Sequence, residues 1–116
     1  MQAIQFIKDH GVEKAREVVS GAPNGATHIR DSYGYVAYLK DGVRKEWYHN
    51  NTWLMTLVWQ PDYLLSDLKR LVESVDLVTA WGGTKEIKNL LNSGVYGIRI
   101  KEALEDYEQI FGGEHV

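Results

Sequence analysis

The stretch that decides the fold is Tyr63-Leu-Leu-Ser-Asp-Leu-Lys-Arg-Leu-Val-Glu-Ser-Val-Asp-Leu-Val-Thr-Ala-Trp-Gly-Gly83. Its leucines and valines recur three, four and seven residues apart, which is the spacing of one face of an α-helix. Ser66 is a suitable N-cap, and Asp67 would lie in the first turn, where the helix dipole favours a carboxylate. The stretch therefore predicts a core helix that ends at Gly82-Gly83, either as one helix or with a second helix beginning near Ser74.

The chain after this stretch predicts two more helices. Residues 84–92 are amphipathic, with Thr84 as the expected N-cap. Residues 100–111 carry apolar side chains on one helical face, so the carboxylates between them are expected on a solvated face. These carboxylates are Glu102, Glu105, Asp106 and Glu108. The sequence thus predicts helical structure over residues 64–111, followed by a loose tail.

The N-terminal part also shows helical spacing of apolar residues, over residues 1–20. Gly11 interrupts this pattern. We expect either two short helices or a kink, with Gly11 at the C-cap of the first helix. Gly21-Ala-Pro-Asn-Gly25 ends the helical region, because proline cannot continue it and Asn-Gly favours a turn.

Residues 27–60 are rich in Tyr, Trp, Val and Ile and predict β-strands. Asp41-Gly42 lies between two such runs, and this dipeptide favours a type I′ hairpin turn. A further run, Trp53–Trp59, follows Asn50-Asn51 and predicts another strand. Tyr33, Tyr35, Ala37 and Leu39 would share one face of the sheet, with Val36, Tyr38 and Lys40 on the other.

These segments together predict an α+β fold. A short antiparallel β-meander of three or four strands (27–60) would pack against N-terminal helices (1–20) and C-terminal helices (64–111). We see no linker that would divide residues 1–116, so a single domain is expected. The length of 116 residues and the hydrophobic content of 44% are those of an ordinary globular domain.

Composition excludes several classes of function. The net charge of −3 argues against a protein that binds nucleic acid over its whole surface. The chain has no cysteine, which excludes disulfides, thiolate zinc sites and a cysteine nucleophile. No apolar run approaches the ~20 residues of a membrane-spanning helix, and the N-terminus lacks the features of a signal peptide. We therefore expect a cytoplasmic protein that does not enter a membrane.

Motifs for catalysis, metals or cofactors are missing from the sequence. The four histidines are isolated and show no metal-ligand spacing. Trp81-Gly-Gly-Thr-Lys85 lacks the spacing of a phosphate-binding loop and is explained by a helix end followed by a helix start. We therefore expect no enzyme activity, no catalytic residue, no cofactor and no metal.

Aromatic residues are interleaved with lysines and arginines in residues 27–60, and three interpretations of this pattern remain open. The rings could simply pack one sheet face against the helices. They could bind a protein, since Tyr, Trp and Arg dominate binding hot spots; the candidate residues are Tyr35, Tyr38, Arg44, Trp47, Tyr48 and Trp53. They could stack on single-stranded nucleic acid. The basic residues that would contact its phosphates are Arg30, Lys40, Arg44 and Lys45. With only three acidic residues against these four bases, the segment is nearly neutral.

Two stretches resemble a known group of proteins. Residues 1–28 are similar to the opening of small accessory proteins of lambdoid phages and enterobacterial prophages, and residues 66–78 with Gly82-Gly83 are similar to a segment near their end. With the closing helix, the resemblance covers a little over half of the chain and leaves out residues 29–62. It carries over no site residue.

The resemblance implies an accessory protein that acts in the host cytoplasm. The function expected is binding of a host or phage protein, with inhibition of that protein as one outcome; the alternative is a nucleic-acid-binding regulator. A free edge of the meander would also allow pairing with a second copy. The unmatched sheet is the natural place for contacts with a target.

Overall fold

The computed structural model describes residues 2–32, 35–94 and 97–112. Predictions for Tyr33, for residues 95–96 and for the tail over 113–116 lie outside the described residues. The chain divides into two compact units, Met1–Lys69 and Arg70–Val116, and the boundary falls within one helix, α3 (Leu65–Ala80). The single-domain prediction stays a prediction.

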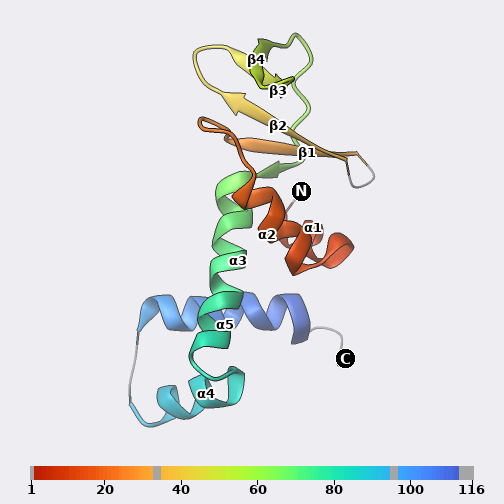
Figure 1. Cartoon of the computed structure of the whole chain (residues 1–116). Helices are drawn as coiled ribbons and strands as arrows, with labels where there is room; N and C mark the ends of the chain where they lie inside the picture. Colours follow the sequence, from red (N-terminus) through yellow and green to blue (C-terminus); the bar gives the residue numbers. More distant parts are fainter. Residues whose placement is uncertain (1, 33–34, 95–96, 113–116) are drawn as a thin grey trace. The chain divides into compact units, whose positions relative to one another are not determined.

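The first unit contains an antiparallel sheet in the order β4-β3-β2-β1-β5 (Figure 1). The α+β class and the antiparallel meander predicted from the sequence are confirmed. The strands are β1 (His28–Ser32), β2 (Tyr35–Asp41), β3 (Lys45–His49), β4 (Thr52–Met55) and β5 (Tyr63–Leu64). The first four follow one another in the meander, and β5 returns to pair with β1 on its other side.

Strand β5 was not predicted, because Leu64 continues the apolar pattern of the following helix. Ile29 faces Tyr63 in the β1–β5 ladder, and both side chains are buried. Backbone hydrogen bonds on either side extend the pairing, from Asp62 N to Ile29 O (2.9 Å) and from Leu65 N to Thr27 O (3.0 Å). The chain therefore enters α3 directly from the sheet.

The hairpin turns differ from the prediction. Asp41-Gly42 does lie at a hairpin, but Asp41 pairs with Lys45 and three residues (42–44) form the loop. Neither Asp41 nor Gly42 has a positive φ, so the predicted type I′ turn is wrong. The two-residue turn with positive φ at both positions is Asn50 (49°) and Asn51 (63°), between β3 and β4. Asparagine adopts this left-handed conformation more readily than most residues, because its short side chain can hydrogen-bond locally.

The ladder register assigns every strand residue to one of two faces, because cross-strand partners share a face and successive residues alternate. We call one side the helix face, because Asp31, Tyr38 and Tyr63 on it contact the N-terminal helices. It carries Ile29, Asp31, Val36, Tyr38, Lys40, Glu46, Tyr48, Trp53, Met55 and Tyr63. The opposite side, the strap face, carries His28, Arg30, Ser32, Tyr35, Ala37, Leu39, Asp41, Lys45, Trp47, His49, Thr52, Leu54 and Leu64. The predicted alternation along β2 is confirmed for the described residues.

Helices α1 (Ala3–His10) and α2 (Val12–Ser20) pack on the helix face. Phe6 of α1 makes an edge contact with Tyr63, at 5.8 Å between ring centroids. The predicted break at Gly11 is confirmed: Gly11 has a φ of 91° and its N–H donates to Ile7 O at 2.7 Å, which caps α1. Glycine adopts this positive φ without steric cost, because it has no Cβ.

The second unit consists of the rest of α3 with α4 (Thr84–Asn92) and α5 (Ile98–Phe111). Its core is formed by apolar side chains from all three helices: Val78, Ile87, Ala103 and Leu104. α3 is one helix through Ser74, so a second helix beginning there is not formed. It begins at Leu65, which places Ser66 inside the first turn and not at the N-cap as predicted.

The end of α3 follows the predicted glycine pair. Gly82 N–H donates to Thr79 O (3.2 Å) and Gly83 N–H donates to Val78 O (2.9 Å), which is the bond pattern of a Schellman motif. Gly82 has the positive φ, 96°, that this motif requires. Gly83 is then the N-cap of α4 and no side-chain cap bond is made, so the prediction of Thr84 as N-cap is wrong.

A buried polar cluster in the second unit was not predicted. Asp106 is only 8% exposed, which corrects its assignment to a solvated face. Its Oδ2 accepts a hydrogen bond from Ser74 Oγ at 2.7 Å, and Ser74, itself fully buried, accepts from Arg99 at 3.1 Å. Arg70 Nε lies 3.4 Å from the same Asp106 oxygen. These partners offset the cost of burying this carboxylate, since a buried charge without them destabilises the fold by several kcal/mol.

Within the described part of the chain, no helix combines the length and the apolar character that crossing a membrane would need.

Candidate functional site

The connection from β4 to β5, residues 56–62, crosses the strap face of the sheet; we call it the strap. It joins strands at opposite edges of the sheet. The ring of Trp59 contacts that of His28 at 5.4 Å, and Lys45 Nζ lies 4.9 Å from the Trp59 centroid. The sequence predicted a strand as far as Trp59, but β4 ends at Met55. Thr56 ends it, because its hydroxyl donates to Val58 O (2.9 Å) and accepts from Val58 N–H (3.1 Å), which closes a local turn.

Between the strap and the sheet lies an open groove of about 530 Å³. Its floor includes Ala37, Leu39 and Trp47, and its wall includes Val58 of the strap. His49 stacks on Trp47, with the ring centroids 4.8 Å apart and an interplanar angle of 23°. The groove therefore offers a flat, mostly apolar floor with an aromatic platform.

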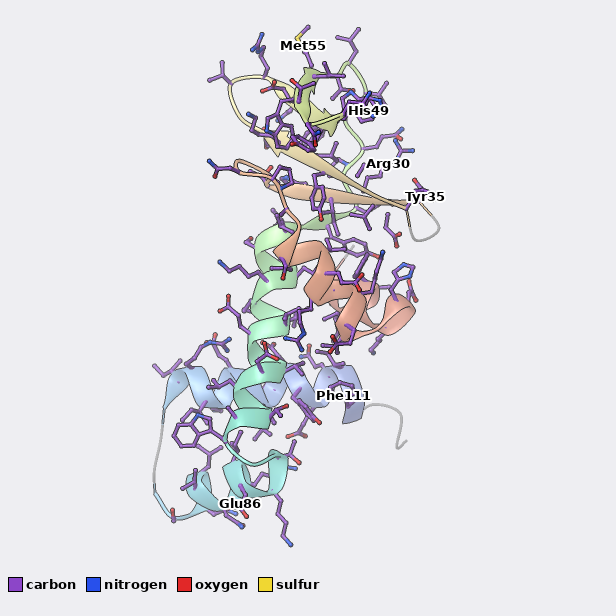
Figure 2. The ribbon with its side chains drawn as sticks, viewed as in Figure 1. Arg30, Tyr35, His49, Met55, Glu86 and Phe111 are labelled. Atoms are coloured by element: carbon purple, nitrogen blue, oxygen red, sulfur yellow. The ribbon has the colours of Figure 1, made fainter. Side chains whose placement is uncertain are left out.

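The rim of the groove is polar and carries little charge. Arg30 and Tyr35 line it, and Tyr35 is 85% exposed; Figure 2 labels both residues together with His49. Among the described residues that line the groove, Arg30 supplies the fixed charge and none is a carboxylate. An apolar ligand that carries an anionic group would match this surface.

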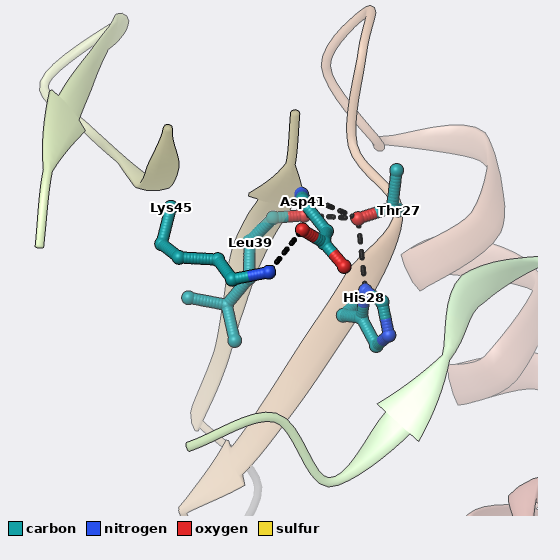
Figure 3. Close-up of polar contacts among 5 residues, drawn as sticks. All are labelled: Thr27, His28, Leu39, Asp41 and Lys45. Carbon is teal, nitrogen blue, oxygen red and sulfur yellow. Dashed lines mark hydrogen bonds and ion pairs between the residues drawn. The ribbon is translucent and has the colours of Figure 1, made fainter. Parts of the chain in front are cut away.

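A hydrogen-bond network fixes the end of β2 beside the groove (Figure 3). Thr27 Oγ1 accepts from Asp41 N–H at 2.8 Å and lies 2.8 Å from His28 Nδ1. Asp41 in turn accepts a hydrogen bond from Lys45 Nζ. Lys45 is therefore paired with a carboxylate on its own hairpin, which reduces its value as a contact for a phosphate.

The helix face holds the other predicted aromatics. Tyr38 donates its hydroxyl hydrogen to Val18 O of α2 at 2.7 Å, and burial raises the pKa of this tyrosine above its ordinary value of 10.0. Tyr48 and Trp53 make an edge contact at 5.1 Å. Lys40 lies over Trp53, 4.7 Å from the ring centroid, and 3.6 Å from Glu46. These groups are explained by packing within the unit.

The six residues predicted to bind a partner thus divide into three places. Tyr35 and Trp47 line the groove on the strap face. Tyr38, Tyr48 and Trp53 lie on the helix face, as shown by the register of β2, β3 and β4, although Tyr48 also borders the groove. Arg44 lies exposed in the hairpin loop over 42–44.

The basic residues predicted to contact nucleic acid are divided between the two faces as well. Arg30 and Lys45 belong to the strap face and Lys40 to the helix face. Both lysines are paired with carboxylates, Lys45 with Asp41 and Lys40 with Glu46. His49 and Val58 are groove residues that the sequence analysis missed. The position of His49 could have been predicted, because side chains two residues apart in a strand lie on the same face and His49 is two residues after Trp47. The position of Val58 could not, because it depends on the path of the strap, which follows no such alternation.

A second hollow, of about 660 Å³, lies where α1 meets β1 and the end of the strap. His10 Nε2 is 2.6 Å from Asp31 Oδ2, and Asp62 Oδ2 accepts from Asp31 N–H at 2.7 Å. Burial, and then the carboxylates of Asp31, Asp9 and Asp62, raise the pKa of Tyr63 above 10.0. These contacts tie α1 and the strap to β1, which is a structural role. In the described ranges, no three His, Asp or Glu side chains are grouped as metal ligands would be.

Comparisons with family models, with curated proteins and with solved structures found no match to this chain.

Proposed function

We propose that this protein acts by binding a host or phage protein through the groove on the strap face. The observation that carries the proposal is the groove itself: an aromatic and aliphatic floor next to an exposed arginine, with no acidic lining among the described residues. Tyr, Trp and Arg are the residue types that dominate binding energy at protein interfaces. The phage context rests on the resemblance of residues 1–28 and 66–78.

The size of the groove limits what it would hold. A volume of about 530 Å³ is typical of a site for a small ligand or for a few side chains. The partner would therefore insert an extended segment with an apolar side chain over Trp47 and a carboxylate near Arg30. A carboxylate can form two parallel hydrogen bonds with a guanidinium group, which gives this contact its geometry.

The test is affinity capture of partners from a host lysate with matched variants. We expect Trp47→Ala and Arg30→Ala to reduce recovery of the partner by about tenfold or more, because each removes a central contact. Arg44→Ala, which removes an exposed arginine outside the groove, and Trp81→Ala, in the second unit, should recover the partner as the wild type does. Circular dichroism checks that all variants are folded. Equal recovery by all five proteins, or no specific partner, would count against the proposal.

The stacked Trp47–His49 pair beside Arg30 supports a second candidate, a nucleic-acid-binding regulator, since such platforms stack on single-stranded bases. A fluorescent single-stranded oligonucleotide distinguishes the two. Binding at low salt that weakens steeply as salt is added would favour this second candidate, because each phosphate contact releases counterions. Absence of binding at low salt would remove it.

A further inference from the structure

Strand β4 forms one edge of the sheet, and its sequence is unusual for an edge. Residues 50–60, Asn-Asn-Thr-Trp-Leu-Met-Thr-Leu-Val-Trp-Gln, contain no charge and no proline. Among the described strands, β4 has a single neighbour, β3. Edge strands are normally protected from pairing by lysine, proline or a bulge. The β4 edge carries neither a charged residue nor a proline that would protect it. Leu54 and Met55 of this strand are 40% and 62% exposed.

The backbone of β4 presents a defined set of groups to this open edge. Thr56 N–H donates to Lys45 O at 2.9 Å, so Thr56 directs its backbone groups toward β3. Because antiparallel strands alternate bonded and non-bonded positions, Thr52 and Leu54 also face β3. The N–H and C=O groups of Trp53 and Met55 therefore face outward. The turn closed by Thr56 and Val58 ends the edge after these two residues.

We propose that this edge pairs with the β4 edge of a second copy of the chain, antiparallel, about a two-fold axis at Leu54. In this register Trp53 of each copy faces Met55 of the other, and all outward N–H and C=O groups of these residues find a partner. Centring the axis on Trp53 or on Met55 would leave part of them unpaired. A two-fold axis makes the interface self-complementary, which is the commonest arrangement of homodimers.

The side chains fit the same register. Leu54 would face its own copy across a non-hydrogen-bonded pair, where Cα atoms are about 4.5 Å apart and side chains are close. Trp53 and Met55 lie on the helix face, and a methionine sulfur makes favourable contacts with an aromatic ring. Figure 2 shows Met55 extending outward from β4. No like charges oppose each other, because the edge has no charge, and a charged partner would find no counter-charge on it.

Charge substitution at Leu54 tests the register. We expect the wild type to sediment as a dimer, and Leu54→Lys and Leu54→Glu to sediment as monomers, because each places two like charges face to face. Mixing the two variants in equal amounts should restore a dimer. Val43→Lys and Val43→Glu change an exposed apolar residue of the hairpin loop and should leave the dimer intact. A monomeric wild type, or a dimer indifferent to charge at position 54, would overturn the proposal.

A cross-link gives an independent readout, since the chain has no cysteine of its own. With oxidised glutathione as oxidant, Leu54→Cys should form a disulfide-linked dimer, because the proposed Cα separation lies within disulfide range. Met55→Cys is the matched control. Its two copies would be offset by two residues, about 8 Å apart, which is too far for a disulfide. Failure to cross-link at position 54, or equal cross-linking at both positions, contradicts the proposed register.

Discussion

At the scale of single residues, two tyrosines of one strand show how position decides role. Tyr35 and Tyr38 are three residues apart in β2, so they lie on opposite faces of the sheet. Tyr35 is 85% exposed at the groove, whereas the hydroxyl of Tyr38 holds α2 through Val18 O. The sequence placed these rings on different faces correctly. It contained nothing to say which face the helices cover.

We expect Tyr38→Phe to lower the free energy of unfolding by about 1 kcal/mol at neutral pH, because the partly buried Val18 carbonyl loses its donor. Urea unfolding measures this. Tyr35→Phe is the matched control and should change stability little, since that hydroxyl is exposed.

The difference between wild type and Tyr38→Phe should depend on pH. Burial raises the pKa of Tyr38 in the folded state, so the unfolded chain loses this proton at a lower pH than the folded protein does. The stabilisation by Tyr38 is therefore complete below pH 10 and is lost as pH rises through the folded-state pKa. Tyr63 is present in both proteins and does not contribute to the difference. A difference that grows above pH 10 would contradict this account.

The cluster around Asp106 leads to a second prediction at this scale. Ser74→Ala should lower the free energy of unfolding by about 1–3 kcal/mol, because a buried carboxylate loses its hydroxyl donor and Arg99 loses an acceptor. Ser93→Ala is the control, since Ser93 makes an exposed bond to Leu90 O. Thermal unfolding followed by circular dichroism compares the two. Equal effects would show that burial of Ser74 is unimportant.

At the scale of elements, glycine positions were the most predictable feature. Gly11 and Gly82-Gly83 interrupt helical spacing, and each marks a helix end in the structure. The turn between β2 and β3 was predicted at the correct place but with the wrong geometry. Loop length depends on which residues pair across the strands, and local propensity does not determine that pairing.

Gly82→Ala should destabilise the protein by about 1 kcal/mol or more, because alanine at a φ of 96° is strained and its Cβ would approach Glu86 Cγ to 3.0 Å. Gly112→Ala is the matched control. Gly112 has a φ of −80°, and the added Cβ meets Glu108 Cβ at 3.5 Å, so this change should be neutral or slightly stabilising. Thermal midpoints that shift equally would contradict the Schellman assignment.

At the scale of the whole molecule, the sequence predicted the class of fold but not the candidate site. Helical spacing and β-prone runs are local, and they gave the order of helices and meander strands. The groove depends on the strap, whose path over the sheet is fixed by contacts such as Trp59 with His28, thirty-one residues earlier in the chain. For the same reason the buried Asp106 was assigned to solvent. Its partner Ser74 is distant in sequence and carries no pattern that links the two.

The strap also has a consequence for how the sheet is expected to assemble. The connections between β1, β2, β3 and β4 are only a few residues long, so each of their pairings closes a small loop at low entropic cost. β5 pairs with β1 only after the whole meander and the strap have been traversed, and this pairing closes the longest loop in the sheet. α3 starts directly at β5, so its first turn is anchored to the sheet by the same late step. We therefore expect the meander to form first, from local contacts, and α3 to be attached to the sheet in a later step.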